Sequence, residues 1–308
     1  QDNVKSHITQ FITTAAANAG FSFCGIAKAE QLPDEARKLE RWLNQGKHGK
    51  MGYMENYFDK RIDPTQLMPG AKSVISLLYN YFPEQTLSSS LKIAKYAYGE
   101  DYHDVIKEKL RLLVTALQQE VGDFEARIFV DSAPVLEKAW AQKSGLGWQG
   151  KNTNLINPKL GSFYFLAEII CDLPLHYDHP IKDYCGTCTA CVDACPTDAL
   201  VEPYQIDASK CISYLTIELK DALIPEQFHG KMENWIFGCD ICQDVCPWNR
   251  FAKQHQEPKF LPTNDLKNVA ANDWKEVTAE IFNQVFKHSA IKRTKWSGWE
   301  RNITTAKN

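Results

Sequence analysis

The chain has 308 residues, of which 44% are hydrophobic and 24% charged, as in a folded protein with a sizeable core. Its net charge of −3 excludes a polycation that binds nucleic acid indiscriminately. No apolar run is long enough for a transmembrane helix, and no basic leader precedes an apolar segment at the N-terminus, so we expect no membrane association, no export signal and a cytoplasmic protein.

The first 180 residues are predicted to form a mixed α/β domain. Residues 1–20 have the apolar spacing of a helix, and the apolar runs at 73–82, 126–131 and 163–173 predict strands. Between the first two strands, residues 101–121 predict an amphipathic helix. The apolar faces of the two helices are formed by Val4, Ile8, Phe11, Ile12 and Ala15 in the first and by Ile106, Leu110, Leu113, Val114, Leu117 and Val121 in the second.

Residues 181–250 form a cysteine-rich part that prolines interrupt, and residues 251–308 form a tail. The tail opens with QEPKFLP at 256–262, which predicts a linker, and continues with the apolar periodicity of helices. That periodicity is carried by Trp274, Val277, Ile281 and Phe286. We therefore expect three parts, bounded at residues 1–180, 181–250 and 251–308.

Eight of the ten cysteines lie between positions 185 and 246, which in a reducing compartment indicates metal ligands rather than disulfides. The segment CGTCTACVDACP at 185–196 has the C-x2-C-x2-C-x3-C-P spacing of bacterial ferredoxins, in which three thiolates bind one [4Fe-4S] cluster and the fourth binds a second. The motif CDICQDVCP at 239–247 is one ligand short, and the isolated Cys211 can supply it. The two predicted ligand sets are Cys185, Cys188, Cys191 and Cys246 for one cluster, and Cys195, Cys211, Cys239 and Cys242 for the other.

A zinc site of four thiolates is the alternative for these cysteines, but zinc explains neither the spacing nor the proline after each terminal cysteine. Cys24 and Cys171 lie in apolar segments and are expected to pack in the core. Clusters whose irons are all bound by thiolates relay electrons and bind no substrate. The rest of the chain must therefore supply the substrate site.

Several segments outside the cysteine motifs resemble the epoxyqueuosine reductase family, among them YFDKRIDPTQLMPGAKSVI, KIAKYAYGEDYHDVIKEKL and VDSAPVLEKAWAQKSGLGWQGKNTNLI. The resemblance implies a cobalamin-dependent enzyme with two [4Fe-4S] clusters, which removes the epoxide oxygen of epoxyqueuosine at the wobble base of tRNA to give queuosine. The fold class expected is α+β: a cobalamin-binding α/β domain, a two-cluster ferredoxin-like module and a helical C-terminal segment.

In this family an aspartate acts as proton donor, and the matching residue here is Asp131 in FVDSAPVLEKAW. Reducing an epoxide and releasing its oxygen as water consumes two electrons and two protons, and an alkoxide leaves poorly unless it is protonated. A carboxylic acid that donates at neutral pH needs a raised pKa, which burial against the corrin favours. The alternative for Asp131 is a helix cap, because D-S-A-P is also a good helix start.

The resemblance also implies cobalamin contacts at Arg61, Lys95, Asp131, Lys151 and Ser213, and the alternative for the three cations is a solvated surface. The segment DYHDVI is close to D-x-H-x-x-G, the pattern by which some proteins donate a histidine to cobalt. Because Ile106 replaces the glycine and the segment begins a helix, we expect no histidine of this chain on cobalt.

The tail segment KHSAIKRTKWSGWERNI combines cations with Trp296 and Trp299, which is typical of a surface that neutralises phosphates and stacks on bases. The alternative is a basic helix end whose tryptophans lie in the core. The predicted tRNA contacts are Lys292, Arg293, Lys295 and Arg301. A tRNA with a queuosine-type anticodon, an unidentified low-potential electron donor and a monomeric enzyme complete the expectation.

Two other functions are compatible with the cysteine motifs. A cobalamin-dependent reductase of a small molecule, similar to reductive dehalogenases, shares the corrin and the two clusters, but the basic aromatic tail argues against it. A ferredoxin-type electron carrier leaves Asp131 and the α/β part without a purpose. Members of the resembled family often continue past RN into helical repeats, whereas this chain ends at RNITTAKN, either as a short member or as part of a longer chain.

Overall fold

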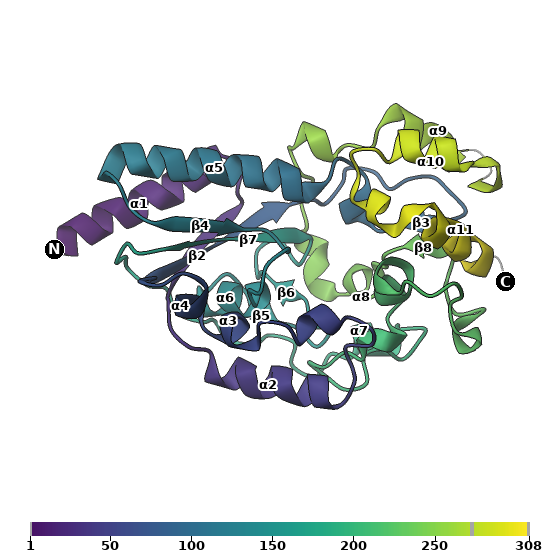
Figure 1. The fold of residues 1–308 in the computed structure, drawn as a ribbon, viewed down its shortest axis with the longest axis horizontal. Coiled ribbons are helices and arrows are strands. Elements are labelled where there is room, and N and C mark those ends of the chain that lie inside the picture. Colours follow the sequence, from purple (N-terminus) through teal and green to yellow (C-terminus); the bar gives the residue numbers. More distant parts are fainter. Residues whose placement is uncertain (1, 272–273, 307–308) are drawn as a thin grey trace.

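An antiparallel sheet of four strands forms the centre of the N-terminal part in a computed structural model, which describes residues 2–271 and 274–306 (Figure 1). Its order is β1 (Phe23–Lys28), β2 (Ser73–Asn80), β7 (Tyr164–Cys171) and β4 (Ala126–Phe129). The strands predicted at 73–82, 126–131 and 163–173 are thereby confirmed. The register places Ser76 of β2 and Phe129 of β4 on either side of Glu168 in β7.

Helices cover both faces of this sheet (Figure 1). On one face lie α1 (Asp2–Asn18) and α5 (Tyr102–Val121), which confirms the two predicted helices. Their core includes the fully buried Ile12, but Val4 is 60% exposed, so the apolar face of α1 is shorter than predicted. Toward the other face lie α2 (Pro33–Asn44), α3 (Phe58–Ile62), α4 (Pro64–Leu67) and α6 (Glu137–Lys143).

The cysteine-rich part is built from short elements. Its helices α7 (Ala190–Asp193) and α8 (Ile241–Asp244) each lie within a cysteine motif, and β5 (Trp148–Gln149) pairs with β6 (Leu155–Ile156). Strand β3 (Lys92–Ile93) pairs in parallel with β8 (Trp235–Phe237). Because β3 and β8 fall on opposite sides of residue 180, the first two predicted parts share a sheet.

The tail contains α9 (Asn264–Ala271), α10 (Ala279–Val285) and α11 (Lys295–Ala306). Its core holds Trp274, Phe286 and Trp299, but Phe282 is buried where the periodicity predicted Ile281, which is 39% exposed. The predicted linker at 256–262 is also anchored: Phe260 is buried in the core of the sheet domain. The α+β fold class with a helical tail is thus confirmed, whereas the linker prediction is wrong.

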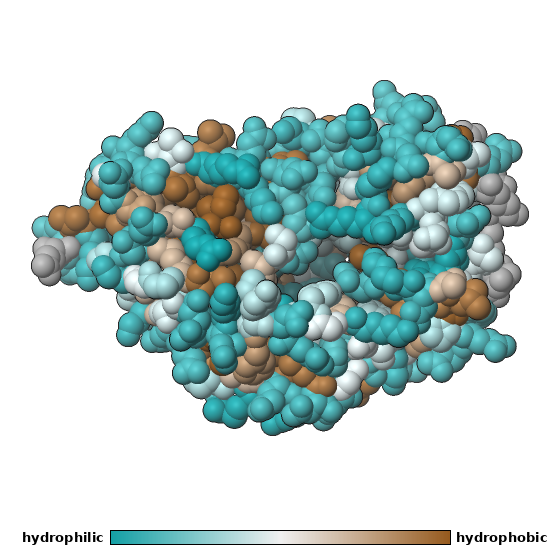
Figure 2. All heavy atoms as spheres, in the orientation of Figure 1, coloured by the Kyte–Doolittle hydropathy of each residue, from teal (hydrophilic) through white to brown (hydrophobic). Residues whose placement is uncertain are grey.

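The face shown in Figure 2 is largely hydrophilic and is hollowed near its middle. Isolated apolar side chains remain on the surface, such as Val4 of α1 and Leu112 of α5. Across residues 2–271 and 274–306, no helix combines the length and the apolar character that spanning a membrane requires.

Candidate active site and cluster sites

Asp131 lies in the wall of a cavity of about 1170 Å³. The other walls come from α2, the loop before α3, α6 and the segment before α11. Pockets for drug-sized ligands reach roughly 1,000 Å³, so this cavity has the size for a larger ligand or for two ligands together. Arg61, Arg293, Glu137 and Lys138 line it with Asp131.

Asp131 projects from the loop that follows β4 and has a backbone φ of 53°, in the left-handed region. Its Oδ2 accepts a hydrogen bond of 2.5 Å from the Tyr102 hydroxyl and lies 3.5 Å from Nε2 of His103. Its backbone N–H donates to Oε1 of Glu137 at 2.6 Å. Because α6 begins only at Glu137 and has no side-chain cap, the helix-cap alternative for Asp131 is wrong.

The electrostatics of Asp131 are set by burial and by three neighbours. Burial raises the pKa of Asp131. The hydrogen bonds from His103 and Tyr102 and the charge of Arg293 lower this pKa by more than burial raises it, so it lies below the ordinary aspartate value. The predicted raised pKa applies to Asp131 buried against the corrin, so it stays a prediction. Sequence reasoning missed these three neighbours because they come from a helix and a tail far from position 131.

His103 connects Asp131 to a second carboxylate. Its Nδ1 lies 2.7 Å from Asp101, and its Nε2 lies 3.1 Å from Nη1 of Arg293. Burial lowers the pKa of His103, and the hydrogen bonds to Asp101 and Asp131 raise it above its ordinary value. Asp101 also caps α5, so DYHDVI begins a helix as expected, and both ring nitrogens of His103 already face protein side chains.

Of the four other residues predicted to contact cobalamin, only Arg61 lines the large cavity. It is 8% exposed, and its guanidinium donates to the carbonyls of Tyr53 at 2.7 Å and Asn56 at 3.2 Å. Ser213 precedes the short helical segment Tyr214–Glu218 and its hydroxyl bonds to the Cys211 thiol. Ser213 thus lies beside a predicted cluster ligand.

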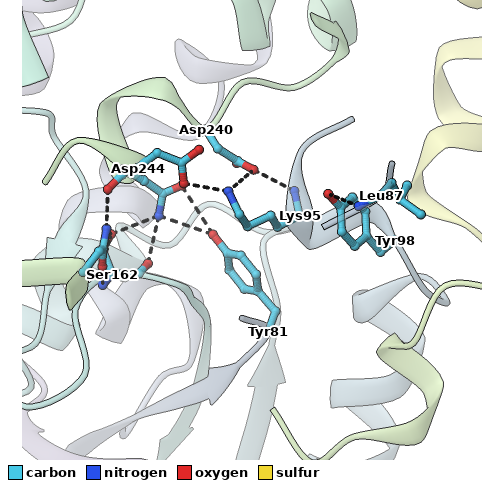
Figure 3. A network of polar contacts seen from close by, with 9 residues as sticks. Tyr81, Leu87, Lys95, Tyr98, Ser162, Asp240 and Asp244 are labelled. Carbon is cyan, nitrogen blue, oxygen red and sulfur yellow. Dashed lines mark hydrogen bonds and ion pairs between the residues drawn. The ribbon is translucent and has the colours of Figure 1, made fainter. Parts of the chain in front are cut away.

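The two lysines are likewise buried among the cluster motifs. Figure 3 shows Lys95 between Asp240 and Asp244, whose carboxylates lie 3.3 and 2.6 Å from its ammonium. Lys151 donates to the carbonyls of Gly186 at 2.6 Å and Cys188 at 2.9 Å. The solvated-surface alternative is wrong for both, because their exposures are 8% and 9%. Lys95 thus connects the segment after β3 to the motif at 239–247. Lys151 connects the loop after β5 to the motif at 185–196.

The structure gathers the first predicted ligand set around one small cavity. This cavity has a volume of about 210 Å³ and is walled by Cys185, Cys188, Cys191 and Cys246. Burial raises the pKa of Cys191, and so do the charges of Cys246 and Cys185. The indole N–H of Trp148 donates to the Cys185 sulfur at 3.4 Å. Cys246 thus lies with the first motif although it belongs to the second.

The second set lies deeper. Burial is the largest cause of the raised pKa of Cys211, Cys239 and Cys242, and the charges that add to it come mainly from within this set. The charge of Cys195 raises the pKa of Cys211, and the charges of Cys211 and Cys195 raise the pKa of Cys242. The two sets therefore interleave in the manner that the cross-over rule describes.

Two further expectations concern the zinc alternative and the two cysteines outside the ligand sets. Within residues 2–271 and 274–306, no group of three or more His, Cys, Asp or Glu side chains is close enough to hold a single metal ion. Cys171 is fully buried and Cys24 packs against the same core, as expected.

The predicted tRNA contacts are dispersed over the tail. Arg293 lies in the wall of the large cavity and forms an ion pair with Asp101 at 2.7 Å. Lys295 is exposed, and Lys292 is half-buried beside the Phe282 ring. Trp299 is fully buried, so it follows the core alternative and cannot stack on a base.

Arg301 does not fit a phosphate contact, because it is buried at 8% exposure. Its guanidinium donates to the carbonyls of Leu215 at 3.0 Å, Leu219 at 2.8 Å and Asp221 at 2.8 Å. Burial lowers its pKa, while Asp221 opposes that shift. Arg301 thus joins α11 to the segment after Cys211, and the sequence motif could not distinguish this role from a surface cation.

Replacing Arg301 with Ala is expected to destabilise the protein by about 2–4 kcal/mol, because three buried carbonyls lose their donor. The measurement is the urea midpoint of the cluster-loaded protein. Lys295→Ala, which removes an exposed cation of the same helix, is the control and should shift stability by less than about 0.5 kcal/mol. Equal midpoints for both variants would contradict the role of Arg301 as a buried clamp.

Similarities to known proteins agree with these sites. A family model described as "4Fe-4S double cluster binding domain" matches residues 184–249, and one described as "Epoxyqueuosine reductase QueG, DUF1730" matches residues 61–132. A protein of Cyclobacterium marinum named epoxyqueuosine reductase is 62% identical over 304 residues, which cover 97% of each chain. The chain belongs to the epoxyqueuosine reductase family.

Two solved structures of this family have the same fold. An epoxyqueuosine reductase with an epoxyqueuosine-modified stem loop of tRNA-Tyr is 31% identical and has a TM-score of 0.86, covering 98% of this chain and 80% of that one. An epoxyqueuosine reductase from Bacillus subtilis, described with its catalytic loop swung out of the active site, is 30% identical with a TM-score of 0.85 and the same coverage. This family membership disfavours the electron-carrier alternative.

Proposed function

We propose that this chain reduces epoxyqueuosine to queuosine at the wobble position of tRNA. The observation that carries the proposal is Asp131: its carboxylate lies in the wall of a large cavity, beside His103, in a chain that also gathers two sets of four thiols. The family relationship supplies the substrate, since one relative was solved with an epoxyqueuosine-modified tRNA stem loop. A small-molecule reductase is the second candidate and is decided by the experiment below.

The cavity fits cobalamin in size and in lining. Beyond its volume of about 1170 Å³, it presents the fixed Arg61 and the cation Lys138, whose ammonium donates to the Thr153 carbonyl at 3.0 Å. Cobalamin carries amides and one phosphate, for which such cations are suitable partners. When bound, cobalamin would supply a redox-active cobalt for the reduction. Arg61 and Asp131 are the proposed contacts that line the cavity. Lys95, Lys151 and Ser213, also proposed from the family resemblance, lie beside the cysteine motifs.

Side chains at the cavity wall position the proton donor and hold its proton. The Tyr102 hydroxyl and His103 hold the Asp131 carboxyl at the cavity wall, and His103 holds a proton more readily than an ordinary histidine because of its two carboxylate neighbours. We infer that Asp131 protonates the leaving oxygen and that His103 sets its position. The left-handed backbone of Asp131 suits a loop that moves, in agreement with the swung-out loop of the Bacillus subtilis relative.

The two sets of thiols would hold two [4Fe-4S] clusters, each passing one electron at a time toward the cavity. Cys188 is exposed, whereas Cys239 and Cys242 are half-buried, which favours entry of electrons from the unidentified low-potential donor at the first set. Lys138 lines the cavity, and its pKa is affected by Cys242 and Cys211, which favours the second set as the one nearer the cavity. We further propose a monomer that acts in the cytoplasm, where tRNA is modified.

The test is a single turnover of an anticodon stem-loop that carries epoxyqueuosine, by protein loaded anaerobically with both clusters and cobalamin. Queuosine should form no faster than the clusters are chemically reduced. The control is the same stem-loop with cluster-loaded protein that lacks cobalamin, which should give no product. Loaded protein that reduces small epoxides or halides but not the stem-loop would overturn the tRNA assignment in favour of the second candidate.

A further inference from the structure

Behind Asp131 lies a carboxyl for which the reaction described so far has no role. Glu168 is in the middle of β7, on the sheet face that α6 covers, and is fully buried. Neither of its oxygens has a hydrogen-bond donor among the described residues. A buried carboxylate without a donor is strongly unfavourable, so this side chain must carry a proton or share one.

Glu137, at the start of α6, is the partner that can share it. Its carboxyl lies within hydrogen-bonding reach of Glu168. Two carboxylates are both acceptors, so a bond between them exists only when one of them is protonated. Burial first, and then the charge of Asp131, raises the pKa of Glu137 to about 8, and burial and Glu137 raise the pKa of Glu168 in the same direction. Two carboxyls in one site cannot both ionise easily.

The pair is connected to the cavity. Glu137 lines the same cavity as Asp131, and its Oε1 accepts the backbone N–H of Asp131 at 2.6 Å. Few charges face the pair: Asp131 from the loop after β4 and Lys138 from α6, with His103 and Arg293 beyond Asp131. The strand neighbours of Glu168 are the uncharged Ser76 and Phe129.

We propose that Glu137, held neutral beside the buried Glu168, passes a proton to Asp131 after Asp131 has protonated the substrate oxygen. This inference rests on the proposed function, because reducing the epoxide consumes two electrons and two protons. The clusters supply the electrons, Asp131 supplies the first proton, and the pair restores Asp131 to its neutral form for the second. Only O–H bonds change in this step: the pair goes from two protons to one, which the two carboxyls then share, and solvent later refills it.

Glu137→Gln is the decisive variant. Its amide oxygen can still accept the Asp131 N–H, so the loop keeps its anchor, but the amide holds no proton that Asp131 can take. At pH 7 we expect single-turnover reduction at least about tenfold slower than in wild type. The wild-type rate should fall as pH rises through about 8, whereas the variant's rate should be nearly flat from about pH 7 to 9.

Infrared spectroscopy of the protein without substrate gives a readout that does not depend on activity. A protonated-carboxyl band at pH 7 is expected in wild type and should be weaker in Glu137→Gln, which keeps only the proton on Glu168. Glu168→Gln should keep the band of Glu137, whose raised pKa comes from burial and Asp131, and should reduce the substrate at close to the wild-type rate. Glu84→Gln, at an exposed carboxyl outside the cavity, is the control and should leave both band and pH profile unchanged.

A wild-type protein without the band, or a Glu137→Gln enzyme with the wild-type rate and pH profile, would overturn the role of Glu137 as a proton reserve. Wild type that shows the band but does not reduce the stem-loop would instead remove the proposed function, and with it the delivery of the proton to Asp131. Failure of the two proposals is therefore distinguishable.

Discussion

Asp131→Asn should slow the reduction of epoxyqueuosine in a single turnover by about 10²–10⁴-fold, the range typical of losing a positioned acid. The amide is isosteric and can still accept the Tyr102 hydroxyl, so the loop and cavity should keep their shape. It cannot, however, release a proton to the leaving oxygen. The measurement is rapid-quench analysis of queuosine formed by protein with both clusters and cobalamin.

Controls for this variant separate chemistry from binding. Asp131→Asn should bind cobalamin and the stem-loop as wild type does, which absorbance and filter binding measure, and its clusters should be reduced at the same rate. Glu202→Gln, which also removes a carboxylate from the cavity, should be as active as wild type. Undiminished turnover by Asp131→Asn would exclude Asp131 as the donor and direct attention to His103, 3.5 Å away.

The cysteine sets were predictable from sequence because ligand spacing along a short segment leaves few ways to surround a cluster. The motif at 185–196 and the shorter one at 239–247 required one external ligand, and Cys211 was the only remaining cysteine between them. The position of Asp131 was likewise available from the family resemblance. Strands and long helices followed from apolar periodicity, which depends on the backbone alone.

The polar contacts between distant segments were not predictable. Lys95 and Arg301 look like surface cations in sequence, and only tertiary structure surrounds Lys95 with two carboxylates and Arg301 with carbonyls. The pKa of Asp131 depends in the same way on His103 and Arg293. In the tail, adjacent apolar residues made periodicity ambiguous by one position, so Ile281 was chosen where Phe282 is buried.

Pairs of cysteine substitutions should distinguish the interleaved ligand sets from sets that follow chain order. If the sets interleave, Cys185 and Cys246 bind the same cluster, so replacing both with Ala should leave about half of the iron, as either single variant does. Replacing Cys185 and Cys195 should remove nearly all of it, because each belongs to a different cluster. Iron analysis and the electron paramagnetic resonance of the reduced protein measure this.

Chain-order sets predict the reverse, because Cys185 and Cys195 would then share a cluster and Cys246 would belong to the other. Cys24→Ala controls for the loss of a thiol that packs against the sheet core, and it should keep all of the iron. The arrangement also has a functional consequence. If Cys246 binds with the first motif, each motif contributes ligands to both clusters, and a shift of either motif would change the distance that an electron must cross to reach the cavity beside Asp131.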